Sequence, residues 1–363
     1  MAVPDESVNI AVRHQVLLER LKSGFYSDFN EVLNRLDKGT QEALMSLDVD
    51  KISQLSKRDL GVLIAELRTL TNDLLTEQIE SFTKDLEKLS RQEAKFEVDS
   101  IKEATIKTAV STPPAGSAFT FANNLPIRAT GTLPKKFFGT MTRNEQDKLE
   151  AVIRKGWVDG ATIPEMVQRV KGTRISNFQD GFTKQAKARV EAQVRTATQH
   201  YSSASREKVW MDNSDIIEGY QWVSTLDSRT TQQCRSLDGR VFEVGDGPMP
   251  PIHYNCRSTT VADLDDDLAF LDEGATRSAR GPSGKSSSVD ADETYYSWLK
   301  KQPKNFQDIA IGPTRGKLLR DGGLSADAFA KMNLGRNFQP MSLKAMADDY
   351  AVVFERAGVP IPE

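Results

Sequence analysis

The chain has few residues of the kinds that build disulfide frameworks, metal centres and membrane spans. Among 363 residues there are 2 cysteines and 3 histidines, which excludes a disulfide-rich secreted scaffold and favours a reducing compartment. No apolar run approaches the roughly 18 residues of a membrane-spanning helix, and the start, MAVPDESVNI, lacks the basic and apolar regions of a signal peptide. We therefore expect no membrane partner, and a protein made in a cytoplasm or used in a particle assembled there.

The chain also lacks a strong excess of charge of either sign. Its formal net charge is −3, so no overall basic field indicates nucleic-acid binding. Hydrophobic residues make up 38% and charged residues 27%, which is polar for a compact enzyme of this length. Such a balance suits elongated helical segments beside one globular domain, and the length allows two or three domains.

Apolar residues spaced by three or four predict almost continuous helix from residue 8 to about 110, interrupted at Gly39. The first stripe contains Leu17, Leu21, Phe25, Phe29, Val32 and Leu36. We expect a helical N-terminal domain over residues 1–112, folded as a hairpin or bundle. The alternative is that one stripe docks another chain. Residues 113–141 are rich in Pro, Gly and Asn, which predicts an extended linker or arm.

Two capping boxes mark helix starts further along the chain. The sequences TRNE at 142–145 and TIPE at 162–165 predict helices over about 143–156 and 163–171. This pair resembles a DNA-binding helix-turn-helix, but its second helix offers few side chains for base contacts. An ordinary packed corner is the interpretation we favour. A long helix is predicted from about 182 to 211.

Strand-like composition then replaces the helical period. Residues 219–227, 240–244 and 257–261 predict a small antiparallel sheet packed on the long helix. The predicted fold is α+β and mainly α-helical, with a long N-terminal helical region and a central domain of helix and small antiparallel sheet. The predicted divisions after the linker are a central domain at 142–275, a flexible linker at 276–292 and a helical C-terminal region at 293–363.

Both cysteines and one histidine lie in a single stretch, CRSLDGRVFEVGDGPMPPIHYNC. Cys234, His253 and Cys256 could be three ligands of a zinc site, but a structural site needs four. Thr231 stands where a nearby second cysteine would be, and threonine is a poor zinc ligand. Asp227 or Asp238 would therefore have to be the fourth ligand. A disulfide between the cysteines is the second alternative. We favour two buried thiols beside a hydrogen-bonded turn, with no metal and no cofactor.

The same residues allow a catalytic interpretation, in which His253 activates a cysteine and Asn255 orients the histidine. Covalent catalysis needs an exposed nucleophile, a base within reach and an orienting group, and no oxyanion site is evident, so we do not expect an enzyme and assign no catalytic residue. Nearby arginines could form either an internal ion-pair network or an exposed anion site, and the network is favoured. Its members would be Asp227, Asp238, Arg229, Arg235 and Arg257, with Arg195 able to join.

The stretch from 220 to 261 resembles the phage Mu F-like, or SPP1 gp7-like, family of minor head proteins. The resemblance is carried by a strand end with Trp, Asp, Arg and Thr, a Cys followed by Asp-Gly, and a Pro-Pro-x-His-x-Asn-Cys-Arg run. Its residues are Trp222, Asp227, Arg229, Thr230, Cys234, Asp238, Gly239, Pro250, Pro251, His253, Asn255, Cys256 and Arg257. A second match, at 295–330, resembles the segment that often follows this motif.

The resemblance implies a structural minor capsid protein of a tailed phage, found in the virion at the portal vertex and in the host cytoplasm during assembly. Its implied partners are the portal protein and other capsid or scaffolding proteins, with contact to genomic DNA during packaging or ejection. The alternatives are a nuclease-like enzyme that uses His253, and an internal protein ejected with the genome. Many relatives carry a second cysteine at the position of Thr231, which gives them four candidate zinc ligands. This chain departs from that pattern, so the resemblance does not imply a zinc site here.

Overall fold

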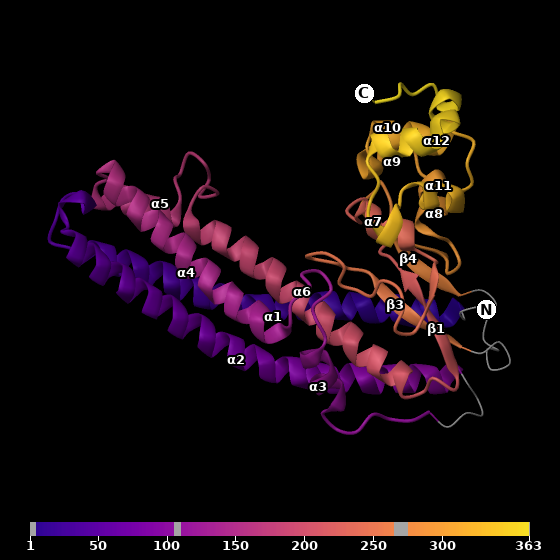
Figure 1. The fold of residues 1–363 in the computed structure, drawn as a ribbon, viewed down its shortest axis with the longest axis horizontal. Helices are drawn as coiled ribbons and strands as arrows, with labels where there is room; N and C mark the ends of the chain where they lie inside the picture. Colours follow the sequence, from indigo (N-terminus) through magenta and orange to yellow (C-terminus); the bar gives the residue numbers. More distant parts are fainter. Residues whose placement is uncertain (1–4, 105–109, 265–274, 363) are drawn as a thin grey trace.

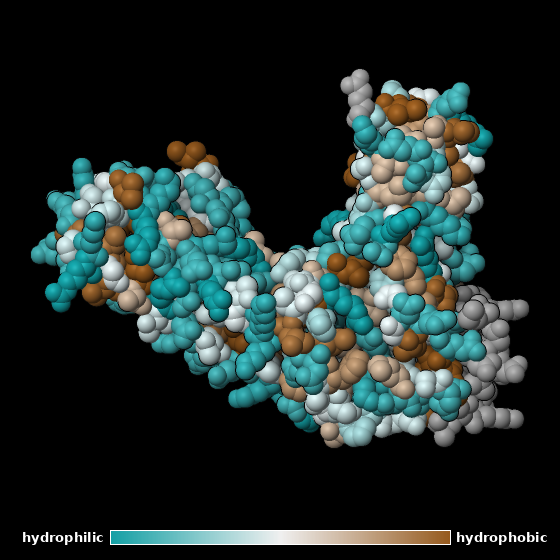
Figure 2. Space-filling model, in the orientation of Figure 1, coloured by the Kyte–Doolittle hydropathy of each residue, from teal (hydrophilic) through white to brown (hydrophobic). Residues whose placement is uncertain are grey.

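The structure is a computed structural model that describes residues 5–104, 110–264 and 275–362. A long helical arm meets a shorter limb, made of small sheets and C-terminal helices, at an angle (Figure 1). The space-filling view shows the hollow between the two limbs (Figure 2). Helices account for 64% of the structure, so the prediction of a mainly helical α+β fold is confirmed.

The arm is built from two antiparallel helices and the helices packed along them. Its elements are α1 (Asp5–Met45), η1 (Ile52–Gln54), α2 (Lys57–Ala104), α4 (Pro134–Asp159), α5 (Ile163–Lys171) and α6 (Phe182–Met211). One apolar core runs along the arm and includes the fully buried Phe29, Leu86, Leu149 and Val190. Helix α5 and the turn between α1 and α2 lie at the free end of the arm (Figure 1).

One of the two predicted capping boxes, at the start of α5, is confirmed. At α5, Thr162 Oγ1 accepts a hydrogen bond from Glu165 N at 3.3 Å, and Thr162 N donates to Glu165 Oε2 at 2.7 Å. The predicted ranges 163–171 and 182–211 match α5 and α6. The box at 142–145 was wrong, because Thr142 is a buried residue inside α4.

Two details of the N-terminal stripe were also wrong. Leu17 and Leu21 are 57% and 36% exposed, because the polar residues Gln15 and Lys22 occupy the core-facing side of α1. Helix α1 also continues through Gly39 without a break. A Cβ atom at Gly39 would lie 2.8 Å from Leu70 Cδ2, so this glycine allows α1 and α2 to approach closely.

The segment predicted as an extended linker, 113–141, is largely helical. It contains α3 (Ser117–Asn124) and the beginning of α4, whose first residue is Pro134. Phe137 and Phe138 are buried in the arm core, and the Phe119 ring stacks on Tyr201 with centroids 5.6 Å apart. These aromatic contacts outweigh the local turn composition.

A three-stranded antiparallel sheet follows α6, as predicted. Its strands are β1 (Ile217–Val223), β2 (Val241–Glu243) and β3 (Thr259–Leu264), in the order β2-β1-β3. Helix α7 (Gln232–Leu237) lies between β1 and β2 in the chain and was not predicted. The Tyr220 ring stacks on Trp210 of α6, at 5.6 Å between centroids, so the sheet packs on the end of the long helix.

The segment predicted as a flexible linker, 276–292, is a β-hairpin instead. Strands β4 (Thr276–Arg280) and β5 (Ser286–Asp290) pair antiparallel, and Arg277 is 3% exposed. Up to residue 362 the C-terminal region is helical, as predicted, with α8 (Tyr295–Lys300), α9 (Lys304–Ile311), α10 (Pro313–Asp321), α11 (Ala326–Met332), η2 (Arg336–Phe338) and α12 (Leu343–Ala357). These helices enclose a separate apolar core.

Candidate functional site

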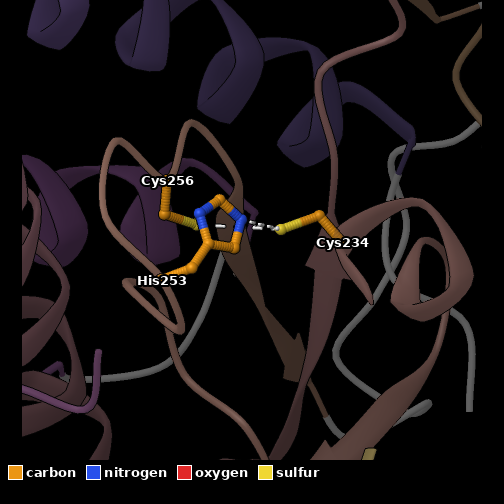
Figure 3. Close-up of side chains that lie close together, drawn as sticks. All are labelled: Cys234, His253 and Cys256. Atoms are coloured by element: carbon orange, nitrogen blue, oxygen red, sulfur yellow. Dashed lines mark hydrogen bonds between the residues drawn. The ribbon is translucent and has the colours of Figure 1, made fainter. Parts of the chain in front are cut away.

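The two cysteines and His253 come together between α7 and the loop that precedes β3. Cys234 lies on α7, and His253 and Cys256 lie on the loop (Figure 3). Cys234 Sγ is 3.0 Å from His253 Nε2 and 3.8 Å from Cys256 Sγ. Both cysteines are free thiols and buried, whereas His253 is half-buried. The predicted pair of buried thiols is therefore present, and the alternative of a disulfide is absent.

Thr231 occupies the fourth corner of this cluster and also begins α7. Its Oγ1 accepts a hydrogen bond from Cys234 N at 3.4 Å and lies 2.9 Å from His253 Nε2. On the other side of the ring, His253 Nδ1 donates to the carbonyl oxygen of Tyr254 at 2.8 Å. A carbonyl can only accept, so Nδ1 carries the proton and, in the neutral ring, Nε2 presents its lone pair to Thr231 and Cys234.

The two thiols differ in acidity although both are buried. Burial raises the pKa of the Cys256 thiol well above its usual value, and the neighbouring Cys234 raises it further. Burial also acts on Cys234, but hydrogen bonds from Cys256, Ser258 and Thr231 outweigh it and lower the pKa of that thiol. The pair therefore favours a state in which Cys234 is the more acidic member and Cys256 keeps its proton.

This geometry meets two of the three conditions for a cysteine nucleophile. The imidazole reaches Cys234 Sγ, and the Tyr254 carbonyl orients the ring. However, Cys234 is only 2% exposed, so a substrate atom has little access to the sulfur. The suggested orienting role of Asn255 was wrong, since Tyr254 takes it; the backbone N–H of Asn255 donates to Thr196 Oγ1 on α6 at 3.1 Å.

A cavity of about 590 Å³ opens beside the cluster, between α6 and the loops. Its lining includes Arg195, Arg229 and Arg257, which sequence alone could have assigned to an anion site. Two of these charges are already paired, Arg195 with Glu19 and Arg257 with Asp227. Arg229 is largely exposed, with a weak 3.7 Å contact to Asp227. The geometry therefore favours the internal network over an anion site.

Asp227 organises the loop between β1 and α7. Its carboxylate receives two hydrogen bonds from the Arg257 guanidinium, at 2.6 and 2.8 Å, and two from the backbone amides of Arg229 and Thr230, at 3.0 and 3.1 Å. Burial opposes ionisation of Asp227, but Arg257 and these donors outweigh burial and lower the pKa of the carboxyl group. Asp227 and Arg257 thus join the two loops that flank the cysteine cluster.

Asp238 joins the sheet to the C-terminal helices. Its oxygens accept hydrogen bonds from Ser224 N at 2.6 Å and Tyr295 N at 2.7 Å, and from the Arg277 guanidinium at 3.1 and 3.2 Å. The side chains of Asp238 and Arg277 are 0% and 3% exposed. Arg277 was not among the expected partners, because its segment has the Gly/Ser-rich composition of a linker.

The remaining arginine of the predicted network has a different role. Arg235 donates to the carbonyl oxygen of Ala310 at 2.6 Å, and its guanidinium lies 5.7 Å from the centre of the Tyr295 ring. It therefore contacts the C-terminal helices and forms no ion pair with Asp227 or Asp238. Together, Arg235 and Asp238 connect α7 and its following turn to the second apolar core.

The other residues of the motif fix the backbone. Trp222 is fully buried, and its indole N–H donates to Ser224 Oγ at 2.9 Å. Gly239 has a φ of +80°, and a Cβ there would lie 2.8 Å from Thr294 Cγ2, so glycine is required. The Pro250–Pro251 peptide bond is cis and Asn255 has a φ of +58°. Gly239 and Asn255 therefore set left-handed backbone conformations in this part of the motif.

A buried lysine, which sequence analysis did not single out, lies behind the cluster. Lys22 of α1 is 0% exposed, and its Nζ donates to Gln199 Oε1 and Glu19 Oε1 at 2.6 Å and to the Cys256 carbonyl at 3.4 Å. Burial lowers the pKa of Lys22, against the opposing effect of Glu19. A polar residue within an apolar helical stripe was the sequence signal that could have revealed it.

The fold and the site together define a mainly helical protein with a small sheet, whose signature residues hold loops and helices together. The family model described as phage Mu protein F like protein matches residues 147–261. That family is one of structural phage head morphogenesis proteins. Comparisons with curated proteins and with solved structures give no match. No described helix has the length and apolar character needed to cross a membrane.

Proposed function

We propose that this protein is a minor structural component of a tailed-phage head that associates with the portal protein and, through it, with other capsid or scaffolding proteins. It would reside in the virion at the portal vertex and act in the host cytoplasm during assembly, without catalysis. The observation that carries the proposal is the Mu F-like segment, which contains the signature residues from Trp222 to Arg257. Its motif carboxylates are engaged in structural ion pairs.

The arm supplies a surface suited to such an association. Several large apolar side chains are exposed near its free end, which we call the arm tip: Met45, Val158, Ile175 and Phe178, which are 60%, 75%, 99% and 38% exposed. Met45 and Phe178 also line a cavity of about 550 Å³. Brown, apolar atoms are visible at this end of the arm (Figure 2). Exposed apolar side chains that gather in one patch are typical of a surface that a partner covers.

The test is co-purification of the full chain with its portal protein, and quantification of both proteins in purified procapsids and heads. We expect a constant, low ratio of this protein to the portal. Ile175→Asp should reduce co-purification at least tenfold, since a charge opposes burial in an apolar interface. The matched control is Val352→Asp on α12, where the valine is 63% exposed and far from the arm tip.

Equal binding by the two variants would remove the arm tip from the proposal. Absence of the protein from both procapsids and heads would contradict the proposal as a whole. Comparing full heads with heads that have released their genome then distinguishes a resident component, which stays, from a protein ejected with the DNA.

A further inference from the structure

The cluster of Cys234, His253 and Cys256 has a geometry that hydrogen bonding alone does not require. A sulfur from each cysteine and a ring nitrogen of the histidine all lie within 4.8 Å of one another. The cysteines come from two separate elements, α7 and the loop before β3, and both are buried (Figure 3). Two thiols and an imidazole are the donors that zinc prefers.

The separation of the two sulfurs fits a shared ion. A disulfide requires about 2.05 Å between sulfurs, whereas two thiolates on one tetrahedral zinc, each with a bond of about 2.3 Å, are about 3.8 Å apart. The observed distance from Cys234 Sγ to Cys256 Sγ is 3.8 Å. The 3.0 Å from Cys234 Sγ to His253 Nε2 is a hydrogen-bond distance, and the half-buried imidazole lines the cavity beside the cluster.

The histidine is also held in the tautomer that a metal ligand needs. Ring nitrogens that bind zinc are usually oriented by a hydrogen bond from the opposite nitrogen to a carbonyl or carboxylate. His253 has this arrangement, because Nδ1 donates to the Tyr254 carbonyl and leaves Nε2 facing the sulfurs. The loop itself is fixed to α6 by the bond from Asn255 N to Thr196 Oγ1.

The fourth position is occupied by Thr231, which is a poor ligand for zinc. Its hydroxyl faces His253 Nε2 at 2.9 Å, and it lines the cavity of about 590 Å³ together with Cys234 and His253. Water in that cavity could complete a tetrahedral set that has three protein ligands. The donors therefore fit the ion, although sequence alone favoured thiols without a metal.

We propose that Cys234, His253 and Cys256 bind one zinc ion, with a water molecule from the cavity as the fourth ligand. Binding displaces the thiol protons to solvent and replaces the hydrogen bonds between the three side chains. The ion would join α7 to the loop before β3, beside the link that Asp227 and Arg257 already make. The ion would hold α7 against this loop and, unlike a closed structural site with four protein ligands, would keep one position open to water from the cavity. This role does not depend on whether the protein associates with a portal.

In the first experiment, a chelator removes bound metal from the full-length, reduced protein. Binding of added zinc, and of cobalt as its substitute, is then measured. We expect one zinc per chain, and a cobalt-substituted form whose visible spectrum shows tetrahedral coordination and thiolate-to-cobalt charge transfer. Cys256→Ser and His253→Ala should each lower the affinity at least tenfold. Less than a tenth of an equivalent of zinc in the unaltered protein, or a spectrum without thiolate bands, would overturn the proposal.

A gain-of-function variant keeps the test decisive if those substitutions prevent folding. Thr231→Cys would supply a fourth thiolate and should raise zinc affinity at least about tenfold, since even outer-shell partners change metal affinity about 10- to 100-fold. Thr231→Ser is the control, because it keeps the hydroxyl that begins α7 and should leave affinity unchanged. Equal affinity in the cysteine and serine variants, or a Cys234–Cys256 disulfide that forms in place of metal binding, would contradict the proposed site.

Discussion

Two regions of the molecule are stabilised in different ways: the arm, and the junction, by which we mean the loops and α7 that carry the motif residues from Trp222 to Arg257 together with the β4–β5 hairpin. In the arm, long helices bury an apolar core, and ion pairs such as Arg68–Asp147 lie on its surface, whereas the buried pair Arg206–Glu97 lies where α2 and α6 meet the sheet. In the junction, the main connections are buried ion pairs, Asp227–Arg257 and Asp238–Arg277, beside the cysteine cluster. Apolar packing tolerates exchange of similar side chains, whereas a buried charge needs its particular partner. The comparison explains why the motif is specified by individual residues.

The largest effect is expected from removing one partner of the buried pair. Asp238→Ala leaves the Arg277 guanidinium buried without a counter-ion and should lower the free energy of unfolding by about 3 to 5 kcal/mol. The C-terminal helices should become sensitive to protease first, because Asp238 also accepts from Tyr295 N. Asp147→Ala is the matched control on the arm, and should cost no more than about 1 kcal/mol. Denaturant titration measures both, and equal losses would contradict the comparison.

A cavity in the arm core should have a comparable but less specific effect. Leu86 is fully buried, and Leu86→Ala should cost about 2 to 5 kcal/mol through lost burial and the cavity left behind. Leu86→Met, which conserves volume, should cost less than about 1.5 kcal/mol. Circular dichroism during denaturant titration measures both losses. If methionine were as harmful as alanine, the arm would depend on individual residues as strongly as the junction does.

Acid should weaken the arm through one buried histidine. Burial lowers the pKa of His200 from 6.5 to about 4, and its Nε2 donates to the Ala122 carbonyl at 2.9 Å. Its contribution to stability is therefore complete above pH 6.5 and is lost as the pH falls towards 4, because only the unfolded chain takes up the proton. The loss is about 3 kcal/mol. His200→Gln should remove that part of the pH dependence; unchanged pH dependence would contradict the assignment.

The smallest effect is expected at a helix start of the arm. Thr162→Ala removes one half of the capping box of α5 and should cost about 1 kcal/mol. Thr162→Ser keeps the acceptor oxygen and should cost only a few tenths. Thermal unfolding monitored by circular dichroism distinguishes the two. Equal stability of the two variants would show that the cap does not contribute to the arm.

Sequence predicted the arm better than the junction, for a physical reason. The start of α5 follows from its capping box and the extent of α6 from its apolar spacing, and both are local signals. The exposure of Leu17 and Leu21 was missed because Gln15 and Lys22 face the core, and the buried face was assigned from apolar residues alone. The helices within 113–141 depend on aromatic contacts with distant residues, which composition does not reveal.

At the site, sequence identified most of the residues but not most of the partners. Cys234, His253 and Cys256 were candidates together, and the structure brings them together. The partner of Asp238 was missed because Arg277 lies 39 residues away in a segment with linker composition. Sequence analysis treated Thr231 as the position where a fourth ligand is missing. Its other role, as the residue whose side chain caps the start of α7, is evident only from the structure.

The measurement that tests the account most directly is a double-mutant cycle on Asp238 and Arg277, beside one on Arg68 and Asp147. If buried ion pairs hold the junction together, the coupling free energy of the first pair should be about 2 to 3 kcal/mol, and that of the surface pair below about 1 kcal/mol. A coupling of Asp238 with Arg277 no larger than that of Arg68 with Asp147 would contradict the account.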